Sequence, residues 1–206
     1  SGEVSFKNSS EFNLAIDTDI SDVTIDFPEG FHTRGNASIK LSGDKLPFLL
    51  SGRYEVASGL IESNFSSGGS ANKTDLLEDL LKQEVSSPLM LDIDILTKNS
   101  IEIRNTLVEG YVEGNLKVYD KLTSPKISGS ASFEDNSIST SVVRFSENEF
   151  EVINSEFIFD GQTPINPKLS LRSTSRLNGY DIDLILQGRA LKPQLTLSSQ
   201  PPLPET

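Results

Sequence analysis

The residues with the clearest potential for chemistry are a single histidine and a run of three carboxylates. His32 lies in "GFHTRG", and the local sequence supplies none of the positioned partners that a general base needs. The three Asp residues of "DTDISD", 17–22, are near one another, but a calcium loop needs a D-x-D-x-D-G run and a later Glu. Ser21 and Pro28 stand where that Asp and that Glu would be. We therefore expect no catalytic residue, no metal and no cofactor.

Motifs of enzyme families are missing as well. The chain has no G-x-S-x-G, H-E-x-x-H, G-x-G-x-x-G or P-loop segment. Asp and Glu are numerous enough to form a glycosidase-like pair in many folds, but nothing in the sequence selects one pair. We expect that the chain is not an enzyme, with a polysaccharide-active β-helix enzyme as a remote alternative.

Composition excludes further classes. The chain of 206 residues has 18 basic and 30 acidic residues, a net charge of −12, which repels phosphate and disfavours nucleic-acid binding. Cysteine is absent, so disulfides and thiolate metal sites are excluded. No stretch approaches the about 18 consecutive apolar residues of a membrane helix. The chain starts with "SGEVSF" and not with Met, and we interpret it as a fragment of a longer protein whose anchor lies outside it.

Alternation of apolar and polar residues is the dominant pattern. "GYDIDLILQG", "MLDIDIL", "IEIRN", "FNLAID" and "VTIDF" all have a period of two, which predicts strands with one apolar face. Turn residues separate such runs, as in "SGDKLP", "DGQTP" and "LNG". Roughly fourteen short strands follow from this pattern, and they predict an all-β, mostly antiparallel fold.

One segment has helical spacing instead. In "KTDLLEDLLKQEV", 73–85, the leucines recur as they do on one side of a short amphipathic helix, and a Gly/Ser-rich stretch precedes them. We expect a helical insertion that plugs an open end or edge of the sheet, through Leu76, Leu77, Leu80 and Leu81. A recruitment helix for a partner is the alternative.

The chain also repeats itself weakly. The segment from Leu14 resembles the segment from Leu91 in pattern, and "SGRYEVASGLI" aligns with "SGSASFEDNSI" at an offset of 77. Gly59 then corresponds to Asn136, which predicts the same turn twice. We expect one elongated β domain over residues 1–206, with repeat units at about 12–66 and 89–146 and further strands at 147–200.

The second half of the chain resembles the C-terminal region of the TamB family, the inner-membrane subunit of the bacterial translocation and assembly module. The resemblance rests on "SPKISG", "FEVINSEFIFDG", "INPKLSL", "YDIDLILQG" and "KPQLTLSSQPPLP", in the order of the family. It implies an elongated curved antiparallel sheet, a β-taco or trough, with an apolar interior. The first half fits the same family more loosely, and the helix at 73–85 departs from it.

The resemblance also implies a function. Relatives span the periplasm of Gram-negative bacteria, are anchored in the inner membrane, carry phospholipid between membranes and assist an outer-membrane assembly partner of the Omp85 type. A phospholipid or other acyl-chain ligand would occupy the trough. The alternative is a structural β-solenoid or adhesin module with a dry protein core.

The residues expected to face inward are aliphatic, whereas a two-sheet sandwich normally brings more large aromatics into its centre. An aliphatic lining makes no hydrogen-bond demands and suits a hydrocarbon ligand, although each position could equally be plain core. The predicted lining is Ile93, Ile95, Leu116, Val118, Leu169, Leu171, Ile182, Leu184, Leu186, Leu195 and Leu197.

Overall fold

Regular structure in the described part of the chain consists of strands alone. The computed structural model describes residues 2–6, 12–26, 30–62, 87–134, 140–162 and 165–202. The all-β prediction is confirmed for these residues. The strands are β1 Gly2–Phe6, β2 Phe12–Ile25, β3 Phe31–Gly43, β4 Phe48–Ile61, β5 Leu89–Arg104, β6 Val108–Lys121, β7 Lys126–Glu134, β8 Val142–Phe145, β9 Asn148–Asp160, β10 Lys168–Leu177, β11 Tyr180–Arg189 and β12 Lys192–Gln200.

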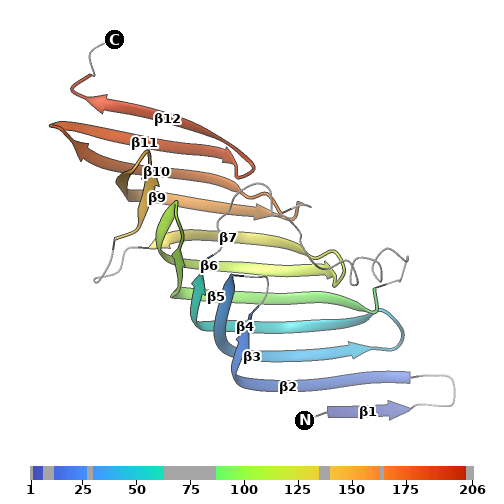
Figure 1. The fold of residues 1–206 in the computed structure, drawn as a ribbon. Helices are drawn as coiled ribbons and strands as arrows, with labels where there is room; N and C mark the ends of the chain where they lie inside the picture. Colours follow the sequence, from blue (N-terminus) through green and yellow to red (C-terminus); the bar gives the residue numbers. More distant parts are fainter. Residues whose placement is uncertain are drawn as a thin grey trace.

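All twelve strands belong to one sheet, and their order in space follows their order in the chain. β8 is the exception, because it pairs with β6 and β9, the same two neighbours as β7. β7 and β8 therefore both lie between β6 and β9, at different points along these two strands. Figure 1 shows the strands stacked from β1 near the N-terminus to β12 near the C-terminus, so the termini lie at opposite ends of an elongated sheet.

One junction departs from the expected antiparallel pairing, so the sheet is mixed. β4 and β5 run parallel, with Phe48 opposite Leu89 and Ile61 opposite Ile103. Parallel neighbours need a connection of a dozen or more residues, and residues 62–88 provide one. Because β2, β3 and β4 are antiparallel, β4 points the same way as β2. Because the β4–β5 junction is parallel, β5 also runs in the direction of β2, and β5, β6 and β7 repeat the strand directions of β2, β3 and β4.

The structure has fewer strands than expected because some predicted strands are continuous. "FNLAID" and the "VTI" of the next run both lie in β2, and "MLDIDIL" and the "IEIR" of the next run both lie in β5. The chain does not turn between them. Instead the pairing skips from Ile20 to Val23 against β3, and from Thr97 to Ile101 against β6. Such bulges add residues to one strand and bend it.

These bulges are adjacent in neighbouring strands, and the sheet bends along them. The β2–β3 ladder shifts next to Gly35, the β3–β4 ladder shifts between Arg34 and Gly35, and the β4–β5 ladder shifts after Val56 and Thr97. Figure 1 shows the left-hand ends of β2, β4 and β5 turned up from the body of the sheet. We term this line of bulges, at residues 21–22, 57–58 and 98–100, the crease.

Two buried clusters lie where strands are bulged. The first contains Ala37, Tyr54 and Val56 at the crease. The second, which we term the β9–β11 cluster, contains Phe150, Val152, Leu171 and Leu184, next to the register shift between Arg172 and Ser173. A single sheet has no second layer to cover its side chains, so bending is what brings them together. Burial is therefore local.

Two glycines have the same surroundings 77 positions apart. Gly52 in β4 has a φ of +147°, and a Cβ there would lie 2.1 Å from the carbonyl oxygen of Ser38. Gly129 in β7 has a φ of +119°, and a Cβ would lie 2.1 Å from the carbonyl oxygen of Asn115. The aligned sequence segments thus have the same local backbone. The turn expected at Gly59 is wrong, because Gly59 lies inside β4, and Asn136 is outside the described residues.

The predicted helix at 73–85, with its four leucines, also lies outside the described residues. No helix in the described part of the chain is long and apolar enough to cross a membrane.

Candidate functional site

The strand registers divide the sheet into two chemically different faces. Residues that are directly opposite in adjacent strands point to the same side, and successive residues alternate. Ile95 is opposite Tyr54 on one side and Leu116 on the other, and Leu116 is opposite Gly129. Gly129 is in turn opposite Phe159 of β9. We term this side the apolar face and the other side the polar face.

All eleven predicted lining residues lie on the apolar face. Ile93 is opposite Val118, and Ile95 is opposite Leu116. Phe157 of β9 is on the apolar face because it is opposite Ala131 of β7, two residues from Gly129. Leu169 of β10 is opposite Phe157 and is therefore on the apolar face too. The remaining predicted positions follow from the β10–β11 and β11–β12 ladders, which pair Leu171 with Leu186, Ile182 with Ser199, Leu184 with Leu197 and Leu186 with Leu195.

The lining residues differ in how far they are covered. Leu171 and Leu184 are buried, at 4% and 1% exposure, whereas Leu195 and Leu197 are exposed at 42% and 48%. The other seven are half-buried. Leu184 belongs to the β9–β11 cluster together with Phe150. It is therefore a core residue, which the alternation of one strand could not indicate, because the bend of the neighbouring strands covers it.

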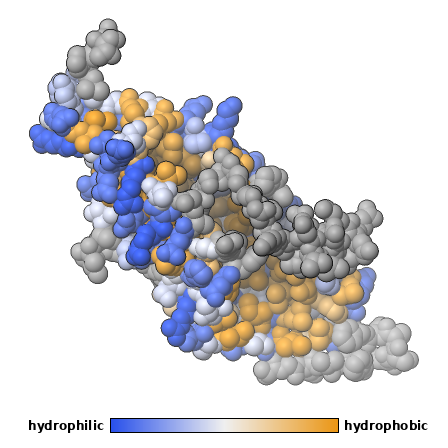
Figure 2. Space-filling model, viewed as in Figure 1, coloured by the Kyte–Doolittle hydropathy of each residue, from blue (hydrophilic) through white to orange (hydrophobic). Residues whose placement is uncertain are grey.

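The apolar face extends well beyond the predicted lining. β2 to β4 and the strands β7 and β9 contribute the same kind of side chain at the same period, a signal already present in "FNLAID", "ASIKLSG" and "EFIFDG". Figure 2 shows hydrophobic residues gathered over the lower strands and again near the top of the molecule, with hydrophilic residues along the left edge. The added residues are Leu14, Ile16, Ile39, Leu41, Leu50, Val56, Phe133, Phe150, Phe157 and Phe159.

Small hydroxyl side chains interrupt the apolar face beside the bulges. Thr97, next to the bulge of β5, donates to the carbonyl oxygen of Val112 at 3.3 Å. Ser173, at the register shift in β10, is fully buried, and its Oγ has no hydrogen-bond partner among the described residues. Such side chains fit where a bent sheet brings neighbours close.

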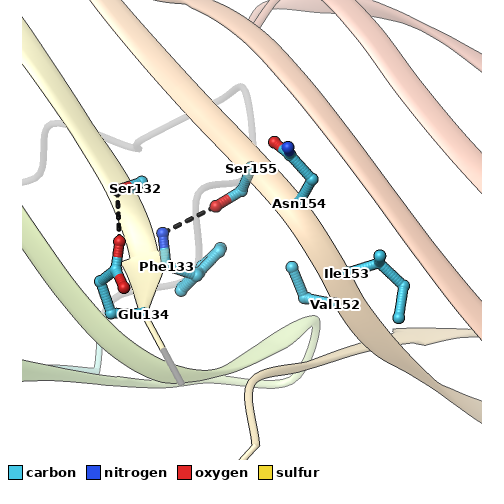
Figure 3. A pocket seen from close by; sticks show the side chains of 7 residues that line it. All are labelled: Ser132, Phe133, Glu134, Val152, Ile153, Asn154 and Ser155. Carbon is cyan, nitrogen blue, oxygen red and sulfur yellow. Dashed lines mark hydrogen bonds between the residues drawn. The ribbon is translucent and has the colours of Figure 1, made fainter. Parts of the chain in front are cut away.

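The ladder between β7 and β9 stops at Ala131 and Phe157. Beyond this point the Oγ of Ser155 accepts a 2.7 Å hydrogen bond from the backbone N–H of Phe133, as Figure 3 shows. A cavity of about 310 Å³ opens between the two strands, lined by Ser132, Phe133, Glu134, Val152, Ile153, Asn154 and Ser155. The side chain of Ser155 thus replaces the missing ladder bond at the break.

The polar face carries ion pairs, some between adjacent strands and one, Arg189 of β11 with Asp160 of β9, across the intervening β10. The Nζ of Lys117 lies 2.7 Å from Asp92 Oδ1 and 3.8 Å from Asp94 Oδ1. The hydrogen bond to Asp92 raises the pKa of Lys117 above its ordinary value. Arg189 binds both carboxylate oxygens of Asp160, at 2.7 and 3.0 Å, and this lowers the pKa of Asp160. These pairs are partly exposed, so each contributes little to stability.

The carboxylates of "DTDISD" have separate partners. Asp19 accepts a hydrogen bond from Ser38 at 2.7 Å, and Asp17 lies 4.0 Å from Lys40. Asp22 is a bulge residue with a φ of +64°, and it forms an ion pair with Arg34. No group of three or more His, Asp and Glu side chains in the described ranges is arranged to hold a metal ion.

His32 has a partner that the local sequence did not indicate. Its Nδ1 lies 3.0 Å from Asp26 Oδ1, with the side chains 54% and 61% exposed. Asp26 directly follows β2, and His32 lies at the start of β3. The pair is exposed to solvent, away from the apolar face.

These features define a class of protein: a single-layer, bent β-sheet with one apolar face and one charged face. The chain belongs to the TamB C-terminal domain family, because the model of that family matches residues 1–206. No curated protein matches the chain. The family is one of bacterial envelope proteins with a role in envelope biogenesis and translocation.

Proposed function

We propose that the apolar face holds or conducts phospholipid acyl chains between the two membranes of a Gram-negative envelope. The observation that carries this proposal is the incomplete cover of that face: most lining residues are half-buried, and Leu195 and Leu197 are exposed. Contiguous exposed apolar surface is rare on soluble proteins and marks a binding site. A hydrocarbon chain fits such a surface because neither partner has hydrogen bonds to lose.

The energy of this contact is sufficient. Burial of one methylene contributes about 0.8 kcal/mol, so about ten methylenes contribute several kcal/mol after the cost of association. The apolar face extends in sheet order from β2 to β12, and the buried β9–β11 cluster divides its open lining, so an acyl chain would lie against apolar side chains on either side of that cluster. The bend at the crease would give the face the form of a trough.

The proposed role in the cell envelope is based on membership of the TamB family. The chain would act in the periplasm as a non-enzymatic segment of a longer protein anchored in the inner membrane. Its macromolecular partner would be an outer-membrane assembly protein of the Omp85 type.

The proposal is tested by lipid capture. Photocrosslinking residues at Leu116, on the apolar face, and at the adjacent Asn115, on the polar face, form a matched pair. The chain is expressed with each in turn, purified gently and analysed by native mass spectrometry. We expect bound phospholipid, crosslinked at 116 and not at 115.

A dry β-solenoid or adhesin core predicts a different result. The β9–β11 cluster shows that part of the face is already protein core. If the whole face were covered in this way in solution, neither position would capture lipid and the purified protein would carry none. Equal capture at both positions would contradict the assignment of faces.

A further inference from the structure

Three turns at one end of the strands share an adjacent lysine and leucine. The turns join β3 to β4, β6 to β7 and β11 to β12, and the strand registers place all three at the same end of the sheet. Figure 1 shows them following one another along the right-hand margin. We term the three pairs the Lys–Leu tips: Lys45 with Leu46, Lys121 with Leu122, and Lys192 with Leu191.

The side chains of the Lys–Leu tips point into solvent. The three leucines are between 48% and 62% exposed, and the three lysines are exposed as well. Within the described residues, none of these lysines forms an ion pair. Lys126, at the same end of the sheet, differs because its Nζ lies 2.8 Å from Asp120 Oδ2. Each tip therefore presents an uncompensated positive charge beside an apolar side chain.

The other end of the strands has the opposite charge. Exposed apolar residues occur there too, at Leu107 and Phe145, but Arg144 beside Phe145 is held by Glu109 and Glu149. Figure 2 shows hydrophilic residues along this left-hand edge. The described carboxylates at this end include Glu62, Glu109, Glu134, Glu147, Glu149 and Asp181.

The two ends are too far apart for their charges to cancel. β3 and β4 have 13 and 14 residues, and at about 3.3 Å per residue each strand is about 40 Å long. Charges in solvent are screened over about 8 Å at physiological ionic strength. A surface that approaches the Lys–Leu tips therefore meets a positive potential, although the chain as a whole has a net charge of −12.

We propose that the Lys–Leu tips dock on the surface of a bilayer that contains anionic phospholipid. The lysines would contact headgroup phosphates, and the leucines would enter the boundary between headgroups and acyl chains. The first and last tips are seven strand spacings apart, about 34 Å. Separate points spread over this distance fit a flat, deformable surface, whereas a folded protein partner would need a matching pocket for each.

This contact would orient the sheet. The strands would run away from the bilayer, and their acidic end would lie on the far side. The inference does not depend on acyl chains binding to the apolar face, because the tips are at the strand ends and belong to neither face. The two proposals can therefore fail separately, since Leu116 tests the apolar face.

Vesicle cosedimentation tests the charge of the tips. The chain should bind vesicles made of equal parts phosphatidylglycerol and phosphatidylcholine at least about tenfold more tightly than vesicles of phosphatidylcholine alone. Higher salt should weaken this binding. Replacement of all three tip lysines should also weaken it at least about tenfold, in the variant Lys45→Gln, Lys121→Gln and Lys192→Gln.

The matched control removes the same charge from the polar face. It replaces three residues that form ion pairs there, as Lys40→Gln, Lys117→Gln and Arg172→Gln. Its net charge equals that of the tip variant, so it should bind the mixed vesicles as wild type does. Circular dichroism establishes that both variants are folded. Equal binding by the tip variant and its control overturns the proposal, and so does failure of the wild-type chain to bind the mixed vesicles.

A polarity-sensitive dye tests whether the leucines enter the bilayer. The chain has no cysteine, so Leu122→Cys and Leu107→Cys each accept a single dye. Leu107 is the control because it is 50% exposed in a turn at the acidic end. We expect the mixed vesicles to shift the emission of the dye to the blue at 122 and not at 107. An equal response at both positions, or none at 122, would show that the tips do not make the contact.

Discussion

Leu184 of β11 lies directly opposite Ser173 of β10, and both side chains are fully covered, at 1% and 0% exposure. In a single sheet this is the exception, because most apolar side chains of the same face are half-buried. The cover comes from the strands that bend beside this pair, through Phe150 and Val152 of β9. This point of the sheet is therefore core, and the lining of the open face begins on either side of it.

Truncation of Leu184 should reveal this difference. Leu184→Ala removes a buried side chain and leaves a cavity, at a cost of about 2–5 kcal/mol in the free energy of unfolding. Leu197→Ala removes the opposite residue of β12, which is 48% exposed, and should cost less than about 1 kcal/mol. Urea denaturation measures both. Equal costs would mean that Leu197 of β12 is covered in solution.

Two serines on the apolar face should respond to the same substitution with opposite sign. Ser155→Ala leaves the backbone N–H of Phe133 without an acceptor and should destabilise the chain by about 1–2 kcal/mol. Ser173→Ala removes a buried hydroxyl that has no partner among the described residues, and should stabilise it by up to about 1 kcal/mol. Thermal and urea unfolding measure both. A loss of stability in Ser173→Ala would show that its hydroxyl is bonded in solution.

The period of two in the sequence predicts strands with one apolar face. Side chains alternate between bulges, so one correct residue fixes the face of its uninterrupted run, whereas a bulge such as that between Ile20 and Val23 shifts the alternation. This is why residues as distant as Ile93 and Leu197 were assigned to the same face before any register was known. The lining of β2 to β4 carried the same signal and could have been predicted with it.

Bulges and strand direction could not be predicted in the same way. Asp22 has a positive φ, which occurs in both turns and bulges. The sequence "DISD" therefore indicates an interruption of the strand, but it does not distinguish a turn from a bulge. The β4–β5 junction is parallel because an odd number of strands, β2 to β4, precedes it and β5 runs in the direction of β2. The sequence pattern predicted two strands in place of β2 and two in place of β5, so the number of strands before the junction was wrong. Burial of Leu184 depends on strands far along the chain, which no local pattern records.

The paired glycines should be intolerant of side chains. At Gly52 and Gly129 a Cβ would lie 2.1 Å from a neighbouring carbonyl oxygen, and φ is positive at both. Gly52→Ala and Gly129→Ala should therefore each cost more than about 1 kcal/mol. Gly179, in the β10–β11 turn, has a φ of +87° but no atom within 4 Å of a Cβ, so Gly179→Ala should cost less. Similar stability of all three variants would show that the backbone relaxes at residues 52 and 129.

Acid should weaken one specific contact. Arg189 holds the pKa of Asp160 below its ordinary value of 3.8, so the folded state favours the carboxylate. The contribution of this pair is therefore fully present above pH 3.8 and is lost as the pH falls through the lower folded pKa. Thermal melting of wild type and Asp160→Asn should differ at pH 7 and converge towards pH 3.

The matched control is Asp181→Asn, which removes a carboxylate 3.7 Å from the Nε of Arg176 on the same face. Because this pair is longer and more exposed, the control should follow wild type across the pH range. A constant difference between wild type and Asp160→Asn at every pH would assign the effect of that substitution to packing and not to charge.

A charge on the apolar face should reduce lipid occupancy where the same charge on the polar face does not. Leu116→Asp places a carboxylate against acyl chains, and its desolvation costs several kcal/mol, so binding of a fluorescent fatty acid should weaken at least about tenfold. Asn115→Asp introduces the same group one residue away on the opposite face, where it is exposed, and should bind as wild type does. Circular dichroism establishes that both variants remain folded. If both variants bind equally, the fatty acid does not lie on the apolar face, and the proposed path for lipid is wrong.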